Sequence, residues 1–296
     1  MQFRRVLRQN LIDELNNLYK NKDSWWHKIV EDKEAMILIR NSRLHVLVNG
    51  GFLLQISMGA SGNLVCKIHE DFLNLRNEKD PYIAITDDET TPPKRVEGLR
   101  GLEKHYQKVK QRIKIFTGSE KKAVQNIALS IKQIIDLEVG LEGEKKKNAS
   151  RKGAQRVDMT GITDDGTLVF FEAKLFGNKE IRAKVRPDVV GQLRKYEKLL
   201  EKYQKEILNG YEDQFRMYRK LNGRFFRQRI PKFEKLQIYP KVRLIITEFD
   251  GSQKTFLEKE ILKKIYDGMA WSHKTPDLIS VGDPKNIKEY HLFKGI

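Results

Sequence analysis

The apolar positions of residues 35–86 fall in short runs that predict β-strands. Turn signals separate these runs, and Asn49-Gly50-Gly51 is the plainest of them. The runs are AMILIR, RLHVLVN, GFLLQISM, NLVCKIH and YIAIT. The next stretch, TDDETTPPKR (86–95), combines acids, threonines and paired prolines, as linkers do. Residues 1–95 are therefore expected to form a small β-rich N-terminal domain that ends in a linker.

From about residue 97 the spacing of apolar residues becomes helical. A first helix is expected with apolar residues at Leu99, Leu102, Tyr106, Val109, Ile113 and Phe116. After a turn, a second helix carries Val124, Ile127, Ile131 and Ile134, and a long third helix carries Val189, Leu193, Tyr196, Leu200, Tyr203 and Ile207. A strand at 242–249, a helix around 254–268 and a short strand at 278–281 follow. Residues 96–296 therefore predict an α/β domain, a mixed sheet flanked by helices.

The stretch RVDMTGITDDGTLVFFEAKLF (156–176) predicts two strands around a tight turn. Asp164-Asp165-Gly166 resembles a three-residue hairpin loop, in which a type I turn is followed by a left-handed glycine. Such a loop pairs Thr163 with Thr167, whereas a two-residue loop would shift the register by one residue.

The three-residue loop sets Asp158 opposite Glu172, with Lys174 on the same face. Two carboxylates this close repel each other, and a divalent cation such as Mg²⁺ removes the conflict. The lysine could then orient or deprotonate a water molecule, or stabilise charge on a phosphate. The alternative is an ordinary Glu–Lys pair on an exposed hairpin, against which the apolar flanking residues argue.

These residues resemble the signature of the PD-(D/E)XK nuclease superfamily, which has the restriction-endonuclease-like fold. The signature is an acid on one strand, here Asp158, and Glu-x-Lys on the next, here Glu172-Ala173-Lys174. The proline of the family's name is replaced by Val157. The resemblance covers about residues 115–250. It implies Mg²⁺-dependent phosphodiester hydrolysis, with Mn²⁺ as a substitute and the Ala173 carbonyl as a further metal ligand.

The family also has an acid on the helix before the hairpin, and Glu120 fits this position. It lies four residues before Val124, on the apolar stripe of the second helix. Glu120 could instead form a capping box with Thr117. Glu138 is the main rival, because it lies on the same face eighteen residues later, while Glu103 lies off the stripe of its own helix.

Gln192 and Tyr196 match the Gln-x-x-x-Tyr element of the RecB-like branch of the superfamily. Their spacing of four places both on one helix face. An unpaired amide there would be costly, so we expect Gln192 to bond either the active site or the nucleic-acid backbone. The alternative is that Tyr196 is a core residue and Gln192 lies at the edge of the stripe. The Gly-x-x-x-His element of some RecB-like enzymes is not evident.

The net charge of the chain indicates which class of binding partner to expect. Lysine and arginine number 57 against 40 acids, a net charge of +17, which favours nucleic acid over an anionic membrane. A basic surface without a specific partner is the simpler alternative. The basic residues expected to bind nucleic acid are Lys145, Lys146, Lys147, Arg151, Lys152, Arg216, Arg219, Arg224 and Arg227. The aromatics interleaved with the last four are expected to anchor a surface helix.

Other features exclude further classes of function. One cysteine, Cys66, rules out an internal disulfide framework, and the absence of a signal peptide favours the cytoplasm. The six histidines lack metal-ligand spacing, and there is no phosphate-binding Gly-x4-Gly-Lys loop.

The leading hypothesis is a metal-dependent deoxyribonuclease of restriction, phage defence or repair, in which Asp158, Glu172, Lys174, Glu120, Gln192 and Tyr196 form the active site. Endonuclease and exonuclease activity, a homodimer and an activating partner protein all stay open. The alternative is a non-catalytic nucleic-acid-binding protein that keeps the nuclease fold.

Overall fold

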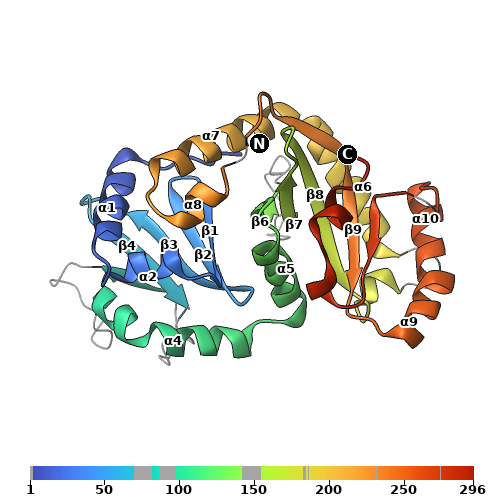
Figure 1. Ribbon diagram of the computed structural model, residues 1–296, viewed down its shortest axis with the longest axis horizontal. Helices are drawn as coiled ribbons and strands as arrows, with labels where there is room; N and C mark the ends of the chain where they lie inside the picture. Colours follow the sequence, from blue (N-terminus) through green and yellow to red (C-terminus); the bar gives the residue numbers. More distant parts are fainter. Residues whose placement is uncertain are drawn as a thin grey trace, which may run out of the picture. The chain divides into compact units, whose positions relative to one another are not determined.

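The computed structural model describes residues 3–69, 82–86, 98–141, 155–182, 185, 187–230, 232–273 and 275–296. It is a mixed α/β structure with two five-stranded sheets, each accompanied by helices (Figure 1). Contacts divide the chain into two compact units. The N-terminal unit consists of Arg4–Gln125 and Asn209–Ile230, and the second unit consists mainly of Asn126–Leu208 and Pro231–Ile296.

The sheet of the N-terminal unit is an antiparallel meander whose strands follow sequence order. The strands are β1 (Ala35–Arg40), β2 (Arg43–Val48), β3 (Gly51–Met58), β4 (Leu64–His69) and β5 (Tyr82–Thr86). All five expected strands are therefore confirmed. One face of the sheet is fully apolar, because cross-strand neighbours such as Ile39, Leu44, Ile56 and Cys66 are completely buried. The expected linker at 86–95 lies outside the described residues apart from Thr86.

The helices of this unit come from two distant parts of the chain. They are α1 (Gln9–Lys20), α2 (Trp25–Glu31), α4 (Gly98–Phe116), the first half of α5 (Ser119–Ser130), most of α7 (Gln204–Lys220) and α8 (Arg224–Gln228). Tyr211, Phe215 and Tyr218 of α7 are buried, and the Tyr218 hydroxyl lies 3.5 Å from the Ile37 carbonyl oxygen of β1. The boundary expected at residues 95 and 96 is thus corrected: 98–125 and 209–230 belong to the same compact unit as the N-terminal sheet, because their buried side chains pack within it.

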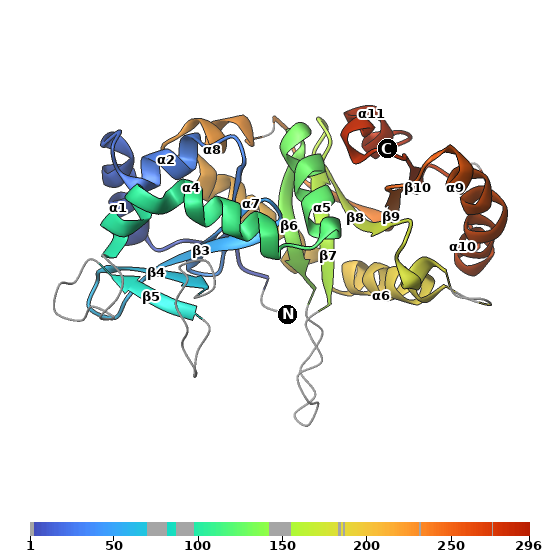
Figure 2. The ribbon, with the colours of Figure 1, turned by 90° about the horizontal axis from the view of Figure 1, so that it is seen from below.

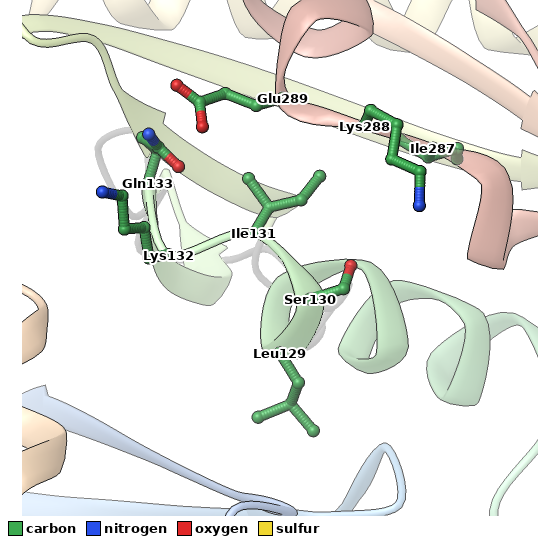
Figure 3. Close-up of a pocket in the computed structure, with 8 residues that line it drawn as sticks. All are labelled: Leu129, Ser130, Ile131, Lys132, Gln133, Ile287, Lys288 and Glu289. Carbon is green, nitrogen blue, oxygen red and sulfur yellow. The ribbon is translucent and has the colours of Figure 1, made fainter.

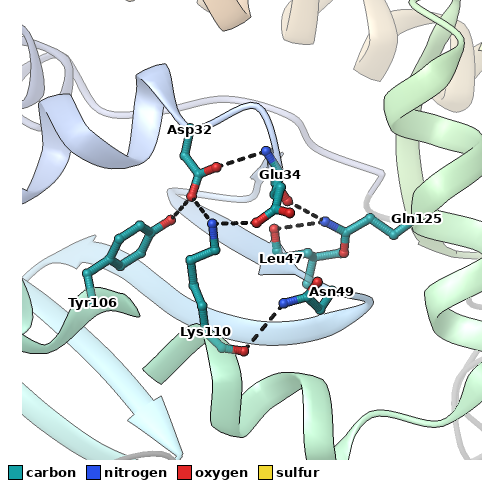
Figure 4. Close-up of polar contacts among 7 residues, drawn as sticks. All are labelled: Asp32, Glu34, Leu47, Asn49, Tyr106, Lys110 and Gln125. Carbon is teal, nitrogen blue, oxygen red and sulfur yellow. Dashed lines mark hydrogen bonds and ion pairs between the residues drawn. The ribbon is translucent and has the colours of Figure 1, made fainter. Parts of the chain in front are cut away.

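A polar network links α4 to the segment between α2 and β1 (Figure 4). Lys110 Nζ lies 2.6 Å from Asp32 Oδ2 and 2.6 Å from Glu34 Oε2, and the Tyr106 hydroxyl donates to the same Asp32 oxygen. Burial works to raise the pKa of Asp32, but the hydrogen bonds from Lys110, the Glu34 backbone and Tyr106 prevail and lower it. Gln125 of α5 extends the network by donating to the carbonyls of Glu34 and Leu47.

The sheet of the second unit has the order β10-β9-β8-β7-β6. Its strands are β6 (Ile134–Gly140), β7 (Arg156–Ile162), β8 (Thr167–Leu175), β9 (Gln237–Thr247) and β10 (Leu278–Ser280). β6, β7 and β8 pair antiparallel, whereas β8, β9 and β10 pair parallel, so the expected mixed sheet is confirmed. Helices α6 (Asp188–Lys202) and α11 (Glu289–Phe293) lie on opposite sides of it (Figure 2).

Two expected helices have different limits. The second expected helix ends at Ser130, and Ile134 begins strand β6 instead of closing the helical stripe. A short buried apolar run has no clear period, which explains the error. The long third helix is interrupted at Tyr203, between α6 and α7, where the backbone leaves helical geometry (φ −115°, ψ 24°). The helix expected around 254–268 is confirmed as α9 (Gly251–Phe256), η2 (Leu257–Leu262) and α10 (Lys263–Met269). Short 3-10 helices are η1 (Lys179–Ile181) and η3 (Pro284–Asn286).

Among the helices in the described part of the chain, none is both long and apolar enough to cross a membrane.

The network around Asp32 predicts a stability effect. Lys110→Met should lower the free energy of unfolding by about 3 kcal/mol, because it leaves a largely buried carboxylate without its cation. Lys114→Met, one turn further along α4 at an exposed position, is the matched control and should change it by less than about 0.5 kcal/mol. Urea denaturation measures both, and equal effects of the two variants would show that the network adds no stability.

Candidate active site

The hairpin of β7 and β8 has the expected register. Gly166 has φ +94°, and the Thr163 and Gly166 backbone amides donate to the carbonyls of Thr167 and Thr163, at 3.0 and 3.1 Å. Met159 pairs with Phe171 and Ile162 with Leu168. The three-residue loop is therefore confirmed, and the next pair in this register sets Asp158 opposite Glu172.

The alternation of the strands separates charged from apolar side chains. On one face Phe171 packs edge-to-face on Phe293 of α11, with ring centroids 5.9 Å apart. The other face carries Asp158, Glu172 and Lys174, and the latter two are only 2% and 5% exposed. The alternative of an ordinary pair on an exposed hairpin is therefore wrong.

Glu172 and Lys174 form an ion pair, and Asp158 is bonded to the backbone of the residue between them. Lys174 Nζ lies 2.7 Å from Glu172 Oε1, and the Ala173 backbone N–H donates to Asp158 Oδ2 at 2.8 Å. Burial works to lower the pKa of Lys174, but the charge of Glu172 and its hydrogen bonds to Glu172 and Glu180 prevail and raise it. Lys174 is thus a cation throughout the neutral pH range. Its contribution to stability is complete below its unfolded pKa of about 10.4 and is lost only as the pH rises above that value.

Glu180 is a site residue that the sequence analysis missed. It lies in the 3-10 helix η1 directly after β8, and its Oε2 is 2.7 Å from Lys174 Nζ. Its side chain is 38% exposed, so this carboxylate is partly in contact with solvent, whereas the lysine that it contacts is buried. The Asn178 side chain caps η1 by accepting from the Glu180 amide. An Asx turn at Asn178 was the available signal for a residue turned back onto the strand.

Gln192 and Tyr196 lie on α6 and form one unit. Gln192 Nε2 donates to the Tyr196 hydroxyl at 2.8 Å, and this hydroxyl donates to the Arg156 carbonyl oxygen at the start of β7. Burial and the charges of Glu172 and Asp158 raise the pKa of Tyr196. The hydrogen bond from Gln192 and the charge of Lys174 lower it, but by less. The pair therefore lies beside the charged face. Gln192 was expected to bond the active site or the nucleic-acid backbone, and in the structure its amide bonds Tyr196 on the same helix.

The two residues expected as a third acid of the site, Glu138 and Glu120, lie in different parts of the structure. Glu138 is in strand β6, not on a helix face as expected, and the β6–β7 register makes it level with Asp158. Its φ of +52° is rare for a residue with a side chain, and its Oε2 lies 3.5 Å from Arg156 Nη1. Glu120 lies in the first turn of α5, in the part that packs with the N-terminal unit. The Thr117 hydroxyl donates to the Ile113 carbonyl oxygen of α4.

The metal ligands are not gathered into a larger cluster. In the described residues, no group of three or more histidine, cysteine, aspartate or glutamate side chains lies close enough together to hold a metal ion. Glu180, which contacts Lys174, is a further carboxylate beside Asp158 and Glu172.

The expected nucleic-acid-binding residues lie in two places. Lys145, Lys146, Lys147, Arg151 and Lys152 fall outside the described residues. Arg216, Arg219, Arg224 and Arg227 are exposed on α7 and α8 of the N-terminal unit, and Arg216 forms an ion pair with Asp213 at 3.1 Å. The aromatics between them are buried, as expected.

A pocket of about 350 Å³ lies elsewhere in the second unit, between the end of α5 and the segment before α11 (Figure 3). Its lining includes Lys132, Gln133, Lys288 and Glu289 but none of the charged residues of the hairpin. The amines of Lys132 and Lys288 point to different sides of it (Figure 3), so they do not converge on one ligand group.

Comparisons of the chain with protein-family models, with curated proteins and with solved structures found no match.

The ion pairs of Lys174 with Glu172 and with Glu180 should differ in their contribution to stability. Lys174→Met should cost about 3 kcal/mol, because Glu172 is buried and loses its cation. Glu180→Gln should cost less than about 1 kcal/mol, because this partner is half-exposed and Lys174 keeps Glu172. Urea denaturation at neutral pH measures both, and a larger loss for Glu180→Gln would contradict this ranking.

The Tyr196 hydroxyl should contribute to the stability of the protein, whereas the Tyr203 hydroxyl should not. Tyr196→Phe should cost about 1–2 kcal/mol, since it leaves the Arg156 carbonyl and Gln192 without their partner. Tyr203 is buried at the end of α6, and its hydroxyl has no hydrogen-bond partner among the described residues, so Tyr203→Phe is the matched control. Thermal unfolding of the two variants gives the comparison. A Tyr203→Phe variant less stable than Tyr196→Phe would refute the bonding pattern.

Proposed function

We propose that the second unit is a Mg²⁺-dependent nuclease that hydrolyses phosphodiester bonds of DNA. The observation that carries the proposal is the meeting of Asp158, Glu172 and Lys174 on one face of a hairpin, with Lys174 buried against Glu172 at 2.7 Å. The resemblance of these residues to the PD-(D/E)XK signature and the mixed sheet support it. A restriction-endonuclease-like fold and a cytoplasmic role in restriction, phage defence or repair belong to the same proposal.

The residues present fit a magnesium ion. Asp158 and Glu172 offer hard carboxylate oxygens, the Ala173 carbonyl is a further oxygen beside them, and Mg²⁺ usually takes only one or two carboxylates plus substrate oxygens. When bound, the ion would activate a water molecule and neutralise charge on the phosphate. Glu138, which the β6–β7 register makes level with Asp158, is the candidate for a third carboxylate within this unit.

Lys174 would act as a cation. Its contacts with Glu172 and Glu180 hold the ammonium group at this face. There it would orient the attacking water and stabilise negative charge on the phosphate. Tyr196 and Gln192 would support this arrangement by holding the start of β7, two residues before Asp158.

The net charge of +17 and the exposed arginines of α7 and α8 favour nucleic acid as the substrate.

The test is a cleavage assay with linear and circular DNA, in Mg²⁺ or EDTA. Lys174→Ala should lower the cleavage rate at least about a hundredfold while DNA binding persists, because it removes charge stabilisation of the transition state. Lys198→Ala, at an exposed position of α6, is the control and should cleave at the normal rate. Circular dichroism checks that both variants are folded.

Three outcomes separate the hypotheses. Cleavage that needs both the metal and Lys174 supports the nuclease, and linear DNA lost while circular DNA survives assigns an exonuclease. A folded Lys174→Ala variant that still cleaves would overturn the mechanism. DNA binding by the wild-type protein without cleavage of any substrate would favour a binding protein that keeps the site as a structural ion pair.

A further inference from the structure

The sheet of the N-terminal unit has a second face that differs from its apolar one. Because side chains alternate along a strand, the residues between the buried ones point to this face. One row across the strands is Leu38, His45, Gln55 and Lys67, and the neighbouring row is Arg40, Arg43, Ser57 and Val65. Arg43 and Lys67 are exposed, and His45, Gln55 and Ser57 are partly exposed. In Figure 2, helices α1, α2 and α4 lie on the other side of β3, β4 and β5.

This face is basic. From Ala35 to His69 the sequence has no aspartate or glutamate, but it has Arg40, Arg43 and Lys67. Arg40 and Arg43 are direct cross-strand partners, so two guanidinium groups lie at one end of this face. The Arg43 guanidinium also donates to Gln55 Oε1 at 3.2 Å, which holds it on the face.

Aromatic rings lie among the cations. His45 and Phe52 pack edge-to-face with ring centroids 5.0 Å apart, and both are partly exposed. Burial and the charges of Arg40, Arg43 and Arg5 lower the pKa of His45 to about 3. The imidazole is therefore neutral at physiological pH and is an aromatic surface rather than a fourth charge.

The spacing fits an extended polyanion better than one small anion. Lys67 lies two strands and one row away from Arg43, which separates their Cα atoms by about 12 Å from standard sheet spacings. Proteins that bind single-stranded nucleic acid combine such a row of cations with exposed aromatic rings on which bases stack.

We propose that this face of the N-terminal sheet, defined by Arg40, Arg43, His45, Phe52, Gln55 and Lys67, binds a single strand of nucleic acid. The phosphates lie against Arg40, Arg43 and Lys67, and a base stacks beside Phe52 and His45. The surface is separate from the exposed arginines of α7 and α8 and contains none of the proposed catalytic residues.

The test measures binding of a labelled single-stranded oligonucleotide to the full chain by fluorescence anisotropy, in EDTA and over a series of salt concentrations. Arg43→Ala/Lys67→Ala should weaken binding at least tenfold. It should also reduce the slope of log K against log salt by about 1.4, since each phosphate contact to a single strand contributes about 0.7. Phe52→Leu should weaken binding without changing this slope.

Matched variants control for charge and folding. Lys28→Ala/Lys33→Ala removes two exposed lysines at α2 and the turn after it, and should keep both affinity and slope. Arg43→Lys/Lys67→Arg keeps the charges and should retain binding. Thermal unfolding shows whether each variant is folded.

Two results would overturn the proposal. One is a folded Arg43→Ala/Lys67→Ala variant that binds no more weakly than Lys28→Ala/Lys33→Ala. The other is a duplex that binds this face as tightly as the single strand, with the same loss in the variant. Because no cleavage is measured, and Lys174→Ala should bind as wild type does, failure here is distinct from failure of the nuclease proposal.

Discussion

The buried ion pair of Lys174 and Glu172 is the interaction on which the arrangement of the candidate active site depends. Two charges removed from water are costly unless their geometry is good and their remaining bonding groups are satisfied. The distance of 2.7 Å and the second carboxylate of Glu180 meet this condition for the lysine. The hairpin register and Glu180 of η1 position the pair, and the Tyr196 hydroxyl of α6 bonds the start of the neighbouring strand β7. A change in any of these would leave a charge buried without its proper environment.

How much of this site the sequence could predict depended on the range of the interactions. The register followed from a local signal, because Gly166 and its neighbours specify one loop length and hence every cross-strand pair. That Gln192 and Tyr196 share one helix face followed from helix periodicity, whereas their hydrogen bond to each other was not expected. Glu180 was missed because its role depends on how the chain turns back after β8, and Glu138 was placed on a helix because its buried strand has no distinctive period.

The organisation of the chain was harder to predict for the same reason. Residues 209–230 were recognised as basic and aromatic, and their aromatics were correctly expected to be buried. Nothing local indicates, however, that they pack with the N-terminal sheet, as the contact of Tyr218 with Ile37, 181 residues earlier in the chain, demonstrates. Apolar stripes show that a helix face is buried but not against which surface.

This arrangement has a consequence for synthesis. The N-terminal sheet emerges from the ribosome first, but Tyr211, Phe215 and Phe226, which are buried in the same unit, are made much later. During the translation of β6, β7, β8 and α6, the first unit therefore lacks part of its core. Domains usually fold as units during synthesis, N-terminal one first. Here the second unit's hairpin is already available before the first unit can finish, so the two units must mature in an overlapping order, and a chain that stops before residue 230 would contain neither unit complete.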